Sequence, residues 1–466
     1  MRKIFSTLTM LALLVAVLPL QAQTDGWTNL FNGKNLKGWT SKGGKAKYEV
    51  IDGQIVGTST MNTPNTFLCT KKKYGDFIIE YETKVEPLLN SGIMFRAQTR
   101  PNKDKTERVY GYQCEVETSP RSWTGGIYDE ARRGWIYNLA RNPKAGAAYK
   151  HGDWNTIRIE AIGNTIRTWV NGVQASYLVD DFDAEGIFGL QVHGIGRDQA
   201  KNGKKVYWRN IRIKTSDFEA DSYRQDPHVP VFNYIPNTLT ASEKHDGWKL
   251  LWNGKDTEGW RGSKSATFPS KGWQISNGEL IVEKADGAES GNGGDIITKD
   301  KYSQFELEVD FMMTKGANSG IKYFVDPEIN KGKGSSIGLE FQILDDKNHP
   351  DAKKGTAGNR TVASLYDLIT AKNLIYPYRK KGFNGIGKWN RARIVVSGDR
   401  VEHWLNNNKV VEYERGSQMF RALVAYSKYS KWENFGELPE GHILLQDHGD
   451  EVHFRSIKIK PLRKPL

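Results

Sequence analysis

The sequence FELEVDFMMTKGANSGIKYF, residues 305–324, recurs in a weaker form as FIIEYETKVEPLLNSGIMFR at residues 77–96. In the earlier copy, Phe77, Ile79 and Tyr81 occupy every second position, which is the period of a β-strand with one buried face. Both copies then continue into the same NSGI motif. The two stretches therefore predict the same pair of strands, formed twice in one chain.

The match extends outward from these stretches in both directions. Three further pairs keep the same order: GWTNLFNGKNLKGW (26–39) with GWKLLWNGKDTEGW (247–260), YEVIDGQIVG (48–57) with WQISNGELIV (273–282), and GDWNTIRIEAIGNTIRTWVNG (152–172) with GKWNRARIVVSGDRVEHWLNN (387–407). Because every segment keeps its place, we interpret the chain as a tandem domain duplication. We assign residues 23–216 to a first, divergent domain, 217–244 to a stiff, proline-containing linker, and 245–466 to a second domain.

Turn signals separate the strand-like runs within each copy. Asp52-Gly53, Asn171-Gly172 and Asn277-Gly278 have the composition of hairpin turns. Helical periodicity is scarce outside residues 417–428. Each copy has about 190 to 220 residues, a size that a single all-β domain reaches. The predicted fold is an antiparallel β-sandwich of the jelly-roll type, formed twice in tandem.

The N-terminus has the layout of a secretory signal peptide. Arg2 and Lys3 precede an apolar run over residues 4–20, and the small residue Ala22 follows. We expect residues 1–22 to be removed, and the protein to be periplasmic or secreted. No second apolar run approaches the roughly 20 residues of a membrane span.

Charge and cysteine content limit the other function classes. The formal net charge is +13, the basic residues are mixed with acidic ones, and no nucleic-acid-binding motif is present, so we expect no nucleic-acid partner. The two cysteines, Cys69 and Cys114, both lie in the first copy. A single disulfide and two buried free thiols are both compatible with the sequence.

The stretch GHILLQDHGDEVHF, residues 441–454, gathers titratable groups at the end of a strand-like run. Alternation places Gln446 and His448 on one face and Asp447 on the other. A weaker copy, GIFGLQVHGIGR at residues 186–197, keeps the glutamine and the histidine, His193, but has valine in place of the aspartate. We therefore place a candidate site at this strand end of the second domain.

Several long motifs of the second copy resemble one known family. They are GLEFQILDD (338–346), ASLYDLI (363–369), GKWN (387–390), VEHWLN (401–406) and GHILLQDHGDEVHFRSIKIK (441–460). Together they resemble the 3-keto-disaccharide hydrolase family, which is similar in fold to the concanavalin A-like lectins and glucanases. The resemblance covers nearly all of the second copy and, more loosely, the first.

The resemblance implies a glycoside substrate whose glucose ring carries a ketone at carbon 3. It also implies cleavage by removal of the C2 proton, elimination of the glycosidic oxygen and addition of water. Because the chain has no nucleotide-binding glycine motif, a separate glucoside 3-dehydrogenase is expected to supply the oxidised substrate.

Alternation within residues 338–345 selects the candidate catalytic side chains. The apolar residues belong in the core, so Glu340 and Gln342 point to the opposite face. Our hypothesis assigns Glu340 and His448 as base and acid, in either order, with Asp447 as a third catalytic candidate. The substrate-binding candidates in this domain are Lys322, Gln342, Tyr366, Lys428 and Gln446.

The first domain departs from this pattern. Gln113 stands at the position of Glu340, and Glu115 stands at the position of Gln342. We expect chemistry in the second domain and binding or divergent activity in the first, with Arg96, Glu115 and His193 as binding candidates.

Three alternatives stay open on the sequence. Glu340 could act with Asp345 or Asp450 in a conventional two-carboxylate glycosidase. The chain could also be a non-catalytic tandem carbohydrate-binding protein, and a solvated sheet face would show the same polar alternation. We expect no cofactor and no metal ligands; a structural calcium ion in the acidic segment 345–351 is an alternative without a matching loop signature.

Overall fold

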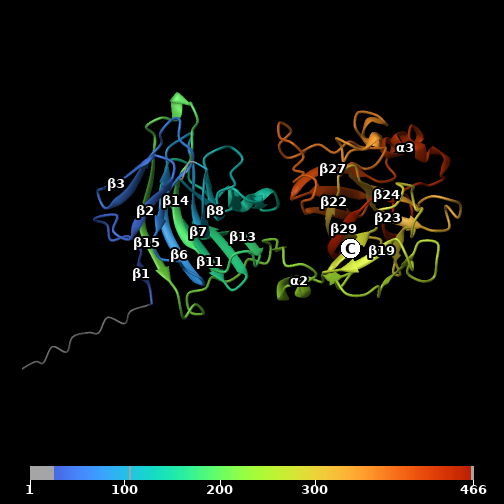
Figure 1. Ribbon diagram of the computed structural model, residues 1–466, viewed down its shortest axis with the longest axis horizontal. Helices are drawn as coiled ribbons and strands as arrows, with labels where there is room; N and C mark the ends of the chain where they lie inside the picture. Colours follow the sequence, from blue (N-terminus) through green and yellow to red (C-terminus); the bar gives the residue numbers. More distant parts are fainter. Residues whose placement is uncertain (1–25, 104–105, 463–466) are drawn as a thin grey trace, which may run out of the picture.

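The computed structural model describes residues 26–103 and 106–462, and shows two β-sandwich domains joined by a linker (Figure 1). The predicted signal peptide, residues 1–22, lies outside the described residues. Within the described ranges, no helix is long and apolar enough to cross a membrane. Each domain has two packed sheets of mainly antiparallel strands, which confirms the predicted concanavalin A-like β-sandwich in two tandem copies.

The first domain packs a nine-stranded sheet against a seven-stranded sheet. The larger sheet has the order β16 (Phe232–Asn233), β13 (Val173–Val179), β12 (Thr165–Val170), β11 (Asn155–Ile162), β6 (Phe77–Val85), β15 (Lys205–Lys214), β4 (Gln54–Thr58) and β3 (Lys47–Ile51), and β1 (Thr28–Asn29) pairs with β15. The smaller sheet has the order β10 (Gly134–Tyr137), β9 (Ile127–Glu130), β8 (Glu107–Glu117), β7 (Asn90–Pro101), β14 (Ile187–Val192), β5 (Thr66–Thr70) and β2 (Trp39–Gly43).

The second domain repeats this arrangement with an eight-stranded and a five-stranded sheet. The larger sheet has the order β19 (Trp273–Ser276), β20 (Glu279–Val282), β29 (Val452–Pro461), β22 (Phe305–Met313), β25 (Asn390–Ser397), β26 (Arg400–Leu405) and β27 (Asn408–Glu414), and β17 (Lys249–Leu250) pairs with β29. The smaller sheet has the order β18 (Trp260–Gly262), β21 (Ile296–Thr298), β28 (His442–Leu445), β23 (Asn318–Asp326) and β24 (Ile337–Leu344).

Helices are short and lie outside the sheets. They are α1 (Pro143–Gly146), α2 (Ala241–His245), α3 (Gln418–Ala425) and the 3-10 turns η1 (Leu139–Arg141), η2 (Gln199–Lys201), η3 (Pro350–Lys353) and η4 (Lys428–Lys431). The helix α3 confirms the helical periodicity expected near residues 417–428. Its first turn is capped by Ser417, whose Oγ accepts a hydrogen bond of 3.1 Å from the main-chain N–H of Phe420.

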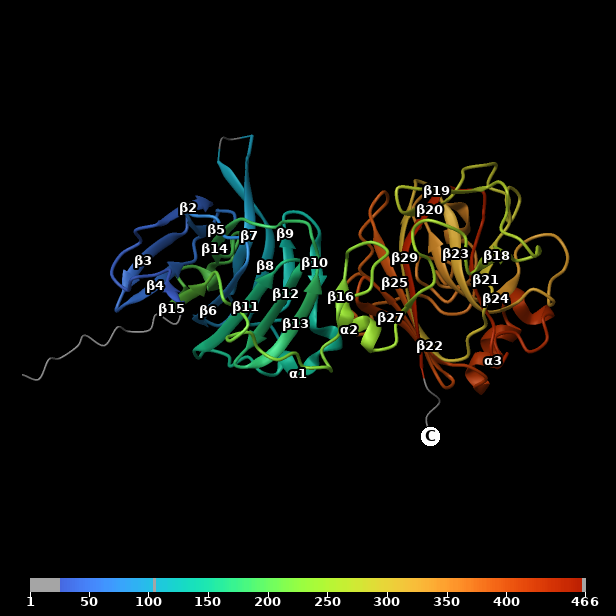
Figure 2. The ribbon, with the colours of Figure 1, turned by 90° about the horizontal axis from the view of Figure 1, so that it is seen from below.

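The linker is attached to both domains rather than free between them (Figure 2). Its strand β16 pairs in parallel with β13 of the first domain. The guanidinium of Arg391, at the start of β25, donates a hydrogen bond of 2.8 Å to the main-chain oxygen of Asn233 in the linker. Asn138 of the first domain donates to the main-chain oxygen of Asn407 in the second at 3.3 Å. Direct polar contacts therefore join the two sandwiches.

Both cysteines are free thiols buried in the first domain. The two sulfur atoms therefore do not form the disulfide that the sequence left open. Burial raises the pKa of the Cys69 thiol to about 12 and also raises that of Cys114. A thiol of this kind is protonated and shielded at neutral pH, so it is a poor nucleophile.

We predict that neither thiol reacts with a water-soluble disulfide reagent in the folded protein at pH 8. In denaturant, both Cys69 and Cys114 should react within the mixing time, because unfolding exposes them and returns their pKa to the ordinary range. The measurement is the release of the coloured thiolate with and without denaturant. Rapid release of one equivalent from the native protein would contradict the burial of both thiols.

Candidate active site

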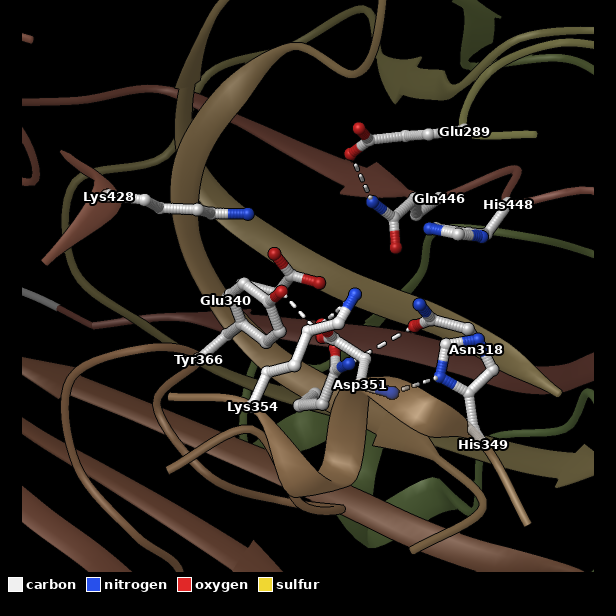
Figure 3. A pocket seen from close by; sticks show the side chains of 11 residues that line it. Glu289, Asn318, Glu340, His349, Asp351, Lys354, Tyr366, Lys428, Gln446 and His448 are labelled. Carbon is white, nitrogen blue, oxygen red and sulfur yellow. Dashed lines mark hydrogen bonds and ion pairs between the residues drawn. The ribbon is translucent and has the colours of Figure 1, made fainter. Parts of the chain in front are cut away.

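A cavity of about 160 Å³ opens over the five-stranded sheet of the second domain (Figure 3). Eleven side chains line it: Glu289, Asn318, Glu340, Gln342, His349, Asp351, Lys354, Tyr366, Lys428, Gln446 and His448. Nearly all of them are polar or charged, and they come from strands β23 and β24, the end of β28 and three loops. Such a lining favours a small hydrophilic ligand, such as a sugar, over an apolar ligand.

The strand β24 places the central carboxylate. Leu339, Phe341 and Ile343 are fully buried in the core between the sheets. Alternation then directs Glu340 and Gln342 into the cavity, as the sequence predicts. The hydrophobic burial of one face therefore fixes the direction of the functional groups on the other.

A glycine of the NSG motif makes room for this carboxylate. A Cβ atom added at Gly320 on β23 would lie 2.3 Å from Oε1 of Glu340. At the equivalent position of the first domain, a Cβ on Gly92 would lie 2.9 Å from the Gln113 side chain. The repeated glycine therefore admits a long side chain from the neighbouring strand in each domain.

Glu340 is only 4% exposed, and burial raises its pKa above the ordinary value for a glutamate. Lys322, whose Nζ lies 3.8 Å from Oε2, opposes this rise, as does Lys428. With its amide oriented so that the NH2 group faces the carboxylate, Gln342 donates a hydrogen bond of 2.9 Å to Oε1. The carboxylate is thus shielded from solvent. The Gln342 amide holds it in place, and the ammonium groups of Lys322 and Lys428 partly balance its charge.

Tyr366 is brought into the cavity by a segment that pairs along β24. The main-chain N–H of Tyr366 donates to the oxygen of Glu340 at 3.0 Å, and that of Ala363 donates to the oxygen of Gln342 at 2.7 Å. The Tyr366 hydroxyl then donates a hydrogen bond of 2.7 Å to Oδ2 of Asp351. Above the ring, Nζ of Lys428 lies 4.2 Å from the ring centroid.

Gln446 and His448 follow the end of β28 and both face the cavity (Figure 3). The Gln446 amide donates a hydrogen bond of 3.1 Å to Oε1 of Glu289, but its own Oε1 is buried without a hydrogen-bond partner. The Nδ1 atom of His448 is also buried without one. Since buried polar atoms are almost always hydrogen-bonded, these two atoms mark positions where a ligand can supply the missing hydrogen bonds.

Two residues of the hypothesis lie next to the cavity rather than in its lining. Lys322 is buried beneath Glu340, where its ammonium donates to Ser335 Oγ and, at 3.2 Å, to the main-chain oxygen of Ser336. Asp447 is fully buried and accepts hydrogen bonds from the main-chain N–H groups of Gly293, Gly294 and Gly449 at 2.8 to 2.9 Å. Asp447 is therefore placed to fix the loop ahead of β21, and its catalytic role stays a prediction.

Five lining residues were not among the residues selected from the sequence: Glu289, Asn318, His349, Asp351 and Lys354. Asn318 could have been found, because it begins the repeated NSG motif. His349 and Asp351 belong to the segment 345–351, whose composition indicated at most a calcium loop. Glu289 lies in a loop with no repeat or periodicity to single it out.

The acidic segment 345–351 is held by hydrogen bonds within the segment and from neighbouring loops. Asp345 Oδ2 accepts from the main-chain N–H of Gly316 at 2.8 Å and from the Asn348 amide at 2.6 Å. Although burial alone would raise it, hydrogen bonds from Tyr366 and Arg360 lower the pKa of Asp351. Across residues 26–103 and 106–462, no group of three or more histidine, cysteine, aspartate or glutamate side chains is arranged to hold a metal ion.

The first domain carries an altered copy of this cluster. Burial raises the pKa of Glu115 to about 7, against the effect of hydrogen bonds from Asn90 and Gln113. The Gln113 amide donates to Oε2 of Glu115 at 2.7 Å, and the Gln191 amide donates to Oε1 of Gln113 at 3.0 Å. Acid and amide have exchanged places relative to Glu340 and Gln342, and side chains of the domain itself satisfy the carboxylate.

The other binding candidates of the first domain lie apart from this cluster or at its edge. Arg96 is buried with a positive φ of 45°, and its guanidinium donates to the main-chain oxygens of Gly75 and Gly163 and to Asp76. It holds loops together. His193 is exposed and bonds the adjacent main-chain oxygen of Gly194 at 2.7 Å. Their binding roles stay predictions.

A family model described as the 3-keto-alpha-glucoside-1,2-lyase-like domain matches residues 26–214 and again 247–460. The chain belongs to this family, and each match coincides with one sandwich. The chain is 39% identical over 237 residues to a 3-keto-disaccharide hydrolase of Bacteroides thetaiotaomicron, covering 47% of this chain and 79% of that protein.

Two solved structures of candidate glycosyl hydrolases from Parabacteroides distasonis are also similar. One shares 29% identity with a TM-score of 0.41, and covers 49% of this chain and 100% of its own. The other shares 27% identity with a TM-score of 0.34, and covers 46% of this chain and 99% of its own.

We predict that Asp447→Ala lowers the free energy of unfolding of the second domain by about 3 kcal/mol, because three main-chain N–H groups, one of them on the buried Gly449, lose their acceptor. The neighbouring His448→Ala should change it by less than about 1 kcal/mol, since His448 is half-buried and its Nδ1 has no partner. Urea unfolding of both variants provides the comparison. An Asp447→Ala protein of unchanged stability that fails to cleave substrate would instead support a catalytic role.

Proposed function

We propose that the protein is an exported glycoside-cleaving enzyme that acts on 3-keto glucosides at the cavity of the second domain. Three observations support this: membership of the family, the name of the Bacteroides relative, and a polar cavity with a buried carboxylate. The observation that carries the proposal is the position of Glu340 beside two unpartnered polar atoms, Gln446 Oε1 and His448 Nδ1.

The reaction that we propose begins with the acidity of the C2 hydrogen next to the ketone. A base takes this proton, and the electron pair moves to the ketone oxygen as an enolate. The enolate then restores the ketone and forms a C1=C2 double bond as the bond from C1 to the glycosidic oxygen breaks and that oxygen takes up a proton. Water then adds to the C1=C2 double bond, with its hydroxyl on C1 and a proton on C2. The net result is hydrolysis, with no change in oxidation level.

Glu340 is our candidate for the base. Its burial weakens solvation of the carboxylate and raises its pKa, which makes it a stronger base than an exposed glutamate. His448 is the candidate for the proton donor to the leaving oxygen. Lys428, whose ammonium reaches the cavity over Tyr366, is the candidate for stabilising the enolate. Lys322, a substrate-binding candidate from the sequence, does not line the cavity.

The two-carboxylate glycosidase is less well supported. Its expected partners for Glu340 were Asp345 and Asp450, and neither lines the cavity. Asp450 Oδ2 accepts a hydrogen bond of 3.0 Å from the main-chain N–H of Asn318, and Asp345 Oδ2 accepts from the main-chain N–H of Gly316 and from the Asn348 amide. A conventional mechanism would need Glu289 or Asp351 as the second carboxylate.

Two parts of the proposal come from the sequence alone. The signal-peptide layout of residues 1–22 supports export to the periplasm or the medium. A separate dehydrogenase is expected to introduce the ketone before this protein acts. We expect no cofactor, because neither the elimination nor the hydration step needs an oxidant or a reductant.

We predict that Glu340→Gln lowers the rate of cleavage of a 3-keto glucoside by about 10²- to 10⁴-fold, the usual effect of losing a general base. Glu115→Gln, the matched change in the first domain, should leave this rate within about twofold. Sugar release from the 3-keto compound and from its unoxidised parent is measured with each variant, and the parent should not be cleaved.

A loss of about half of the rate in each variant would indicate that both domains cleave the substrate. Binding of the 3-keto glucoside without cleavage by the unaltered protein would contradict the enzyme and favour a tandem carbohydrate-binding protein.

The pH profile provides a second test, in which two substitutions should shift the acid limb in opposite directions. The acid limb of kcat/KM reports deprotonation of the base in the free enzyme. Lys428 lowers the pKa of Glu340 and Glu289 raises it. Lys428→Met should therefore move the acid limb to higher pH, and Glu289→Gln should move it to lower pH. Limbs that stay in place in both variants would show that Glu340 is not the group that titrates.

A further inference from the structure

A second cavity, of about 570 Å³, lies between the two domains and the linker. The first domain contributes the turn between β9 and β10 and the segment after β13, and the second contributes β22, β29 and the turn before β25. This volume falls within the roughly 300 to 1,000 Å³ typical of small-molecule sites. None of its lining residues lines the cavity around Glu340.

The wall from the second domain holds an arginine without a full set of partners. The Arg455 guanidinium lies 3.9 Å from the centroid of the Trp389 ring, and its Nε is buried without a hydrogen-bond partner. Its ion pair is a long one, 3.9 Å to Oδ2 of Asp310. Both oxygens of Asp310 already accept hydrogen bonds from Arg391, at 2.6 and 3.0 Å. The charge of Arg455 is therefore poorly matched by the protein itself.

A second cation, Lys388, directly precedes Trp389 in the sequence. Lys388 also lines the cavity, is exposed, and takes part in no ion pair found among the described residues. The arginines on the opposite wall differ: Arg132 pairs with Asp129 at 2.8 Å, and Arg133 pairs with Asp180 at 2.5 Å. The unmatched positive charge thus gathers on the side formed by the second domain.

Aromatic and amide groups surround these cations. Trp389 lies behind Arg455, and Phe182 of the first domain is 56% exposed at the cavity. The amide of Asn384 adds hydrogen-bonding capacity at the exposed rim. The exposed part of the Phe182 ring can pack against the C–H face of a sugar, and polar groups are present for its hydroxyls, which favours a saccharide over a bare ion.

We propose that this interdomain cavity is a second binding site, distinct from the cleavage site, for a sugar that carries a carboxylate, such as a uronic acid. The guanidinium of Arg455 and the ammonium of Lys388 bind the carboxylate, since charge-assisted hydrogen bonds to carboxylates are among the stronger ones in proteins. The ligand contacts both domains, so its binding also stabilises their joint arrangement.

The test is calorimetric titration of the intact mature protein with glucuronate, with glucose as its neutral counterpart and with sodium sulfate as a simple anion. Glucuronate should bind, and glucose and sulfate should bind at least tenfold more weakly. Arg455→Gln and Lys388→Ala should each weaken glucuronate binding by about tenfold, the effect of losing one charged hydrogen bond. Because Lys388 is exposed, its variant will fold even if the Arg455 variant does not.

Two control variants locate the site. Lys347→Ala removes an exposed lysine that lines neither cavity, and Glu340→Gln alters the cleavage site. Both should keep full affinity for glucuronate. Absence of glucuronate binding, equal binding of sulfate, or binding that is lost in Glu340→Gln but kept in Lys388→Ala would each overturn the proposal.

Discussion

The alternation of β24 between core and cavity is the constraint on which the site depends. Phe341 can be buried between the sheets only if its neighbours, Glu340 and Gln342, point the other way. A carboxylate that is 4% exposed carries a cost in free energy, which nearby cations and the Gln342 amide offset in part. The apolar packing of the sandwich therefore holds the Glu340 carboxylate in a buried position, although a charged carboxylate is better solvated in water.

Repeats and period-two alternation can be recognised directly in the sequence. The parts of the structure that depend on them could therefore be predicted. The two sandwiches and the direction of Glu340, Gln342, Gln446 and His448 follow from such patterns. Glu289 and Asp351 could not be predicted in the same way. They reach the cavity from irregular loops, whose paths are set by tertiary contacts such as the hydrogen bond from Tyr366 to Asp351.

Alternation also fails to distinguish a lining side chain from a buried one beneath it. Lys322 and Glu340 are register partners on adjacent strands, yet the ammonium turns toward Ser335 and Ser336 and away from the cavity lining. Asp447 was selected because it stands among titratable neighbours, while its carboxylate serves three main-chain N–H groups. Sequence proximity to a site identified these residues, but only the hydrogen bonds indicate what each one does.

The two domains use one scaffold in different ways. The exchange of acid and amide between Glu340/Gln342 and Gln113/Glu115 keeps one carboxylate in each copy but moves it by two residues along the strand. In the first domain Asn90 and Gln113 both donate to that carboxylate, whereas in the second domain polar atoms at the cavity remain without partners. The carboxylate of one copy is therefore satisfied by its own domain, whereas the other copy leaves polar atoms at its cavity without hydrogen-bond partners.

Incorporation of deuterium at C2 tests the elimination account most directly. The protein would cleave a 3-keto glucoside in D2O, and the released sugar would be analysed at once by mass spectrometry and NMR, with an enzyme-free incubation to correct for spontaneous exchange. The account predicts one deuterium at C2, because the proton removed by the base is replaced from solvent when water adds. Release of sugar that retains its original C2 hydrogen, at the same rate of cleavage, would contradict it and indicate direct displacement at C1.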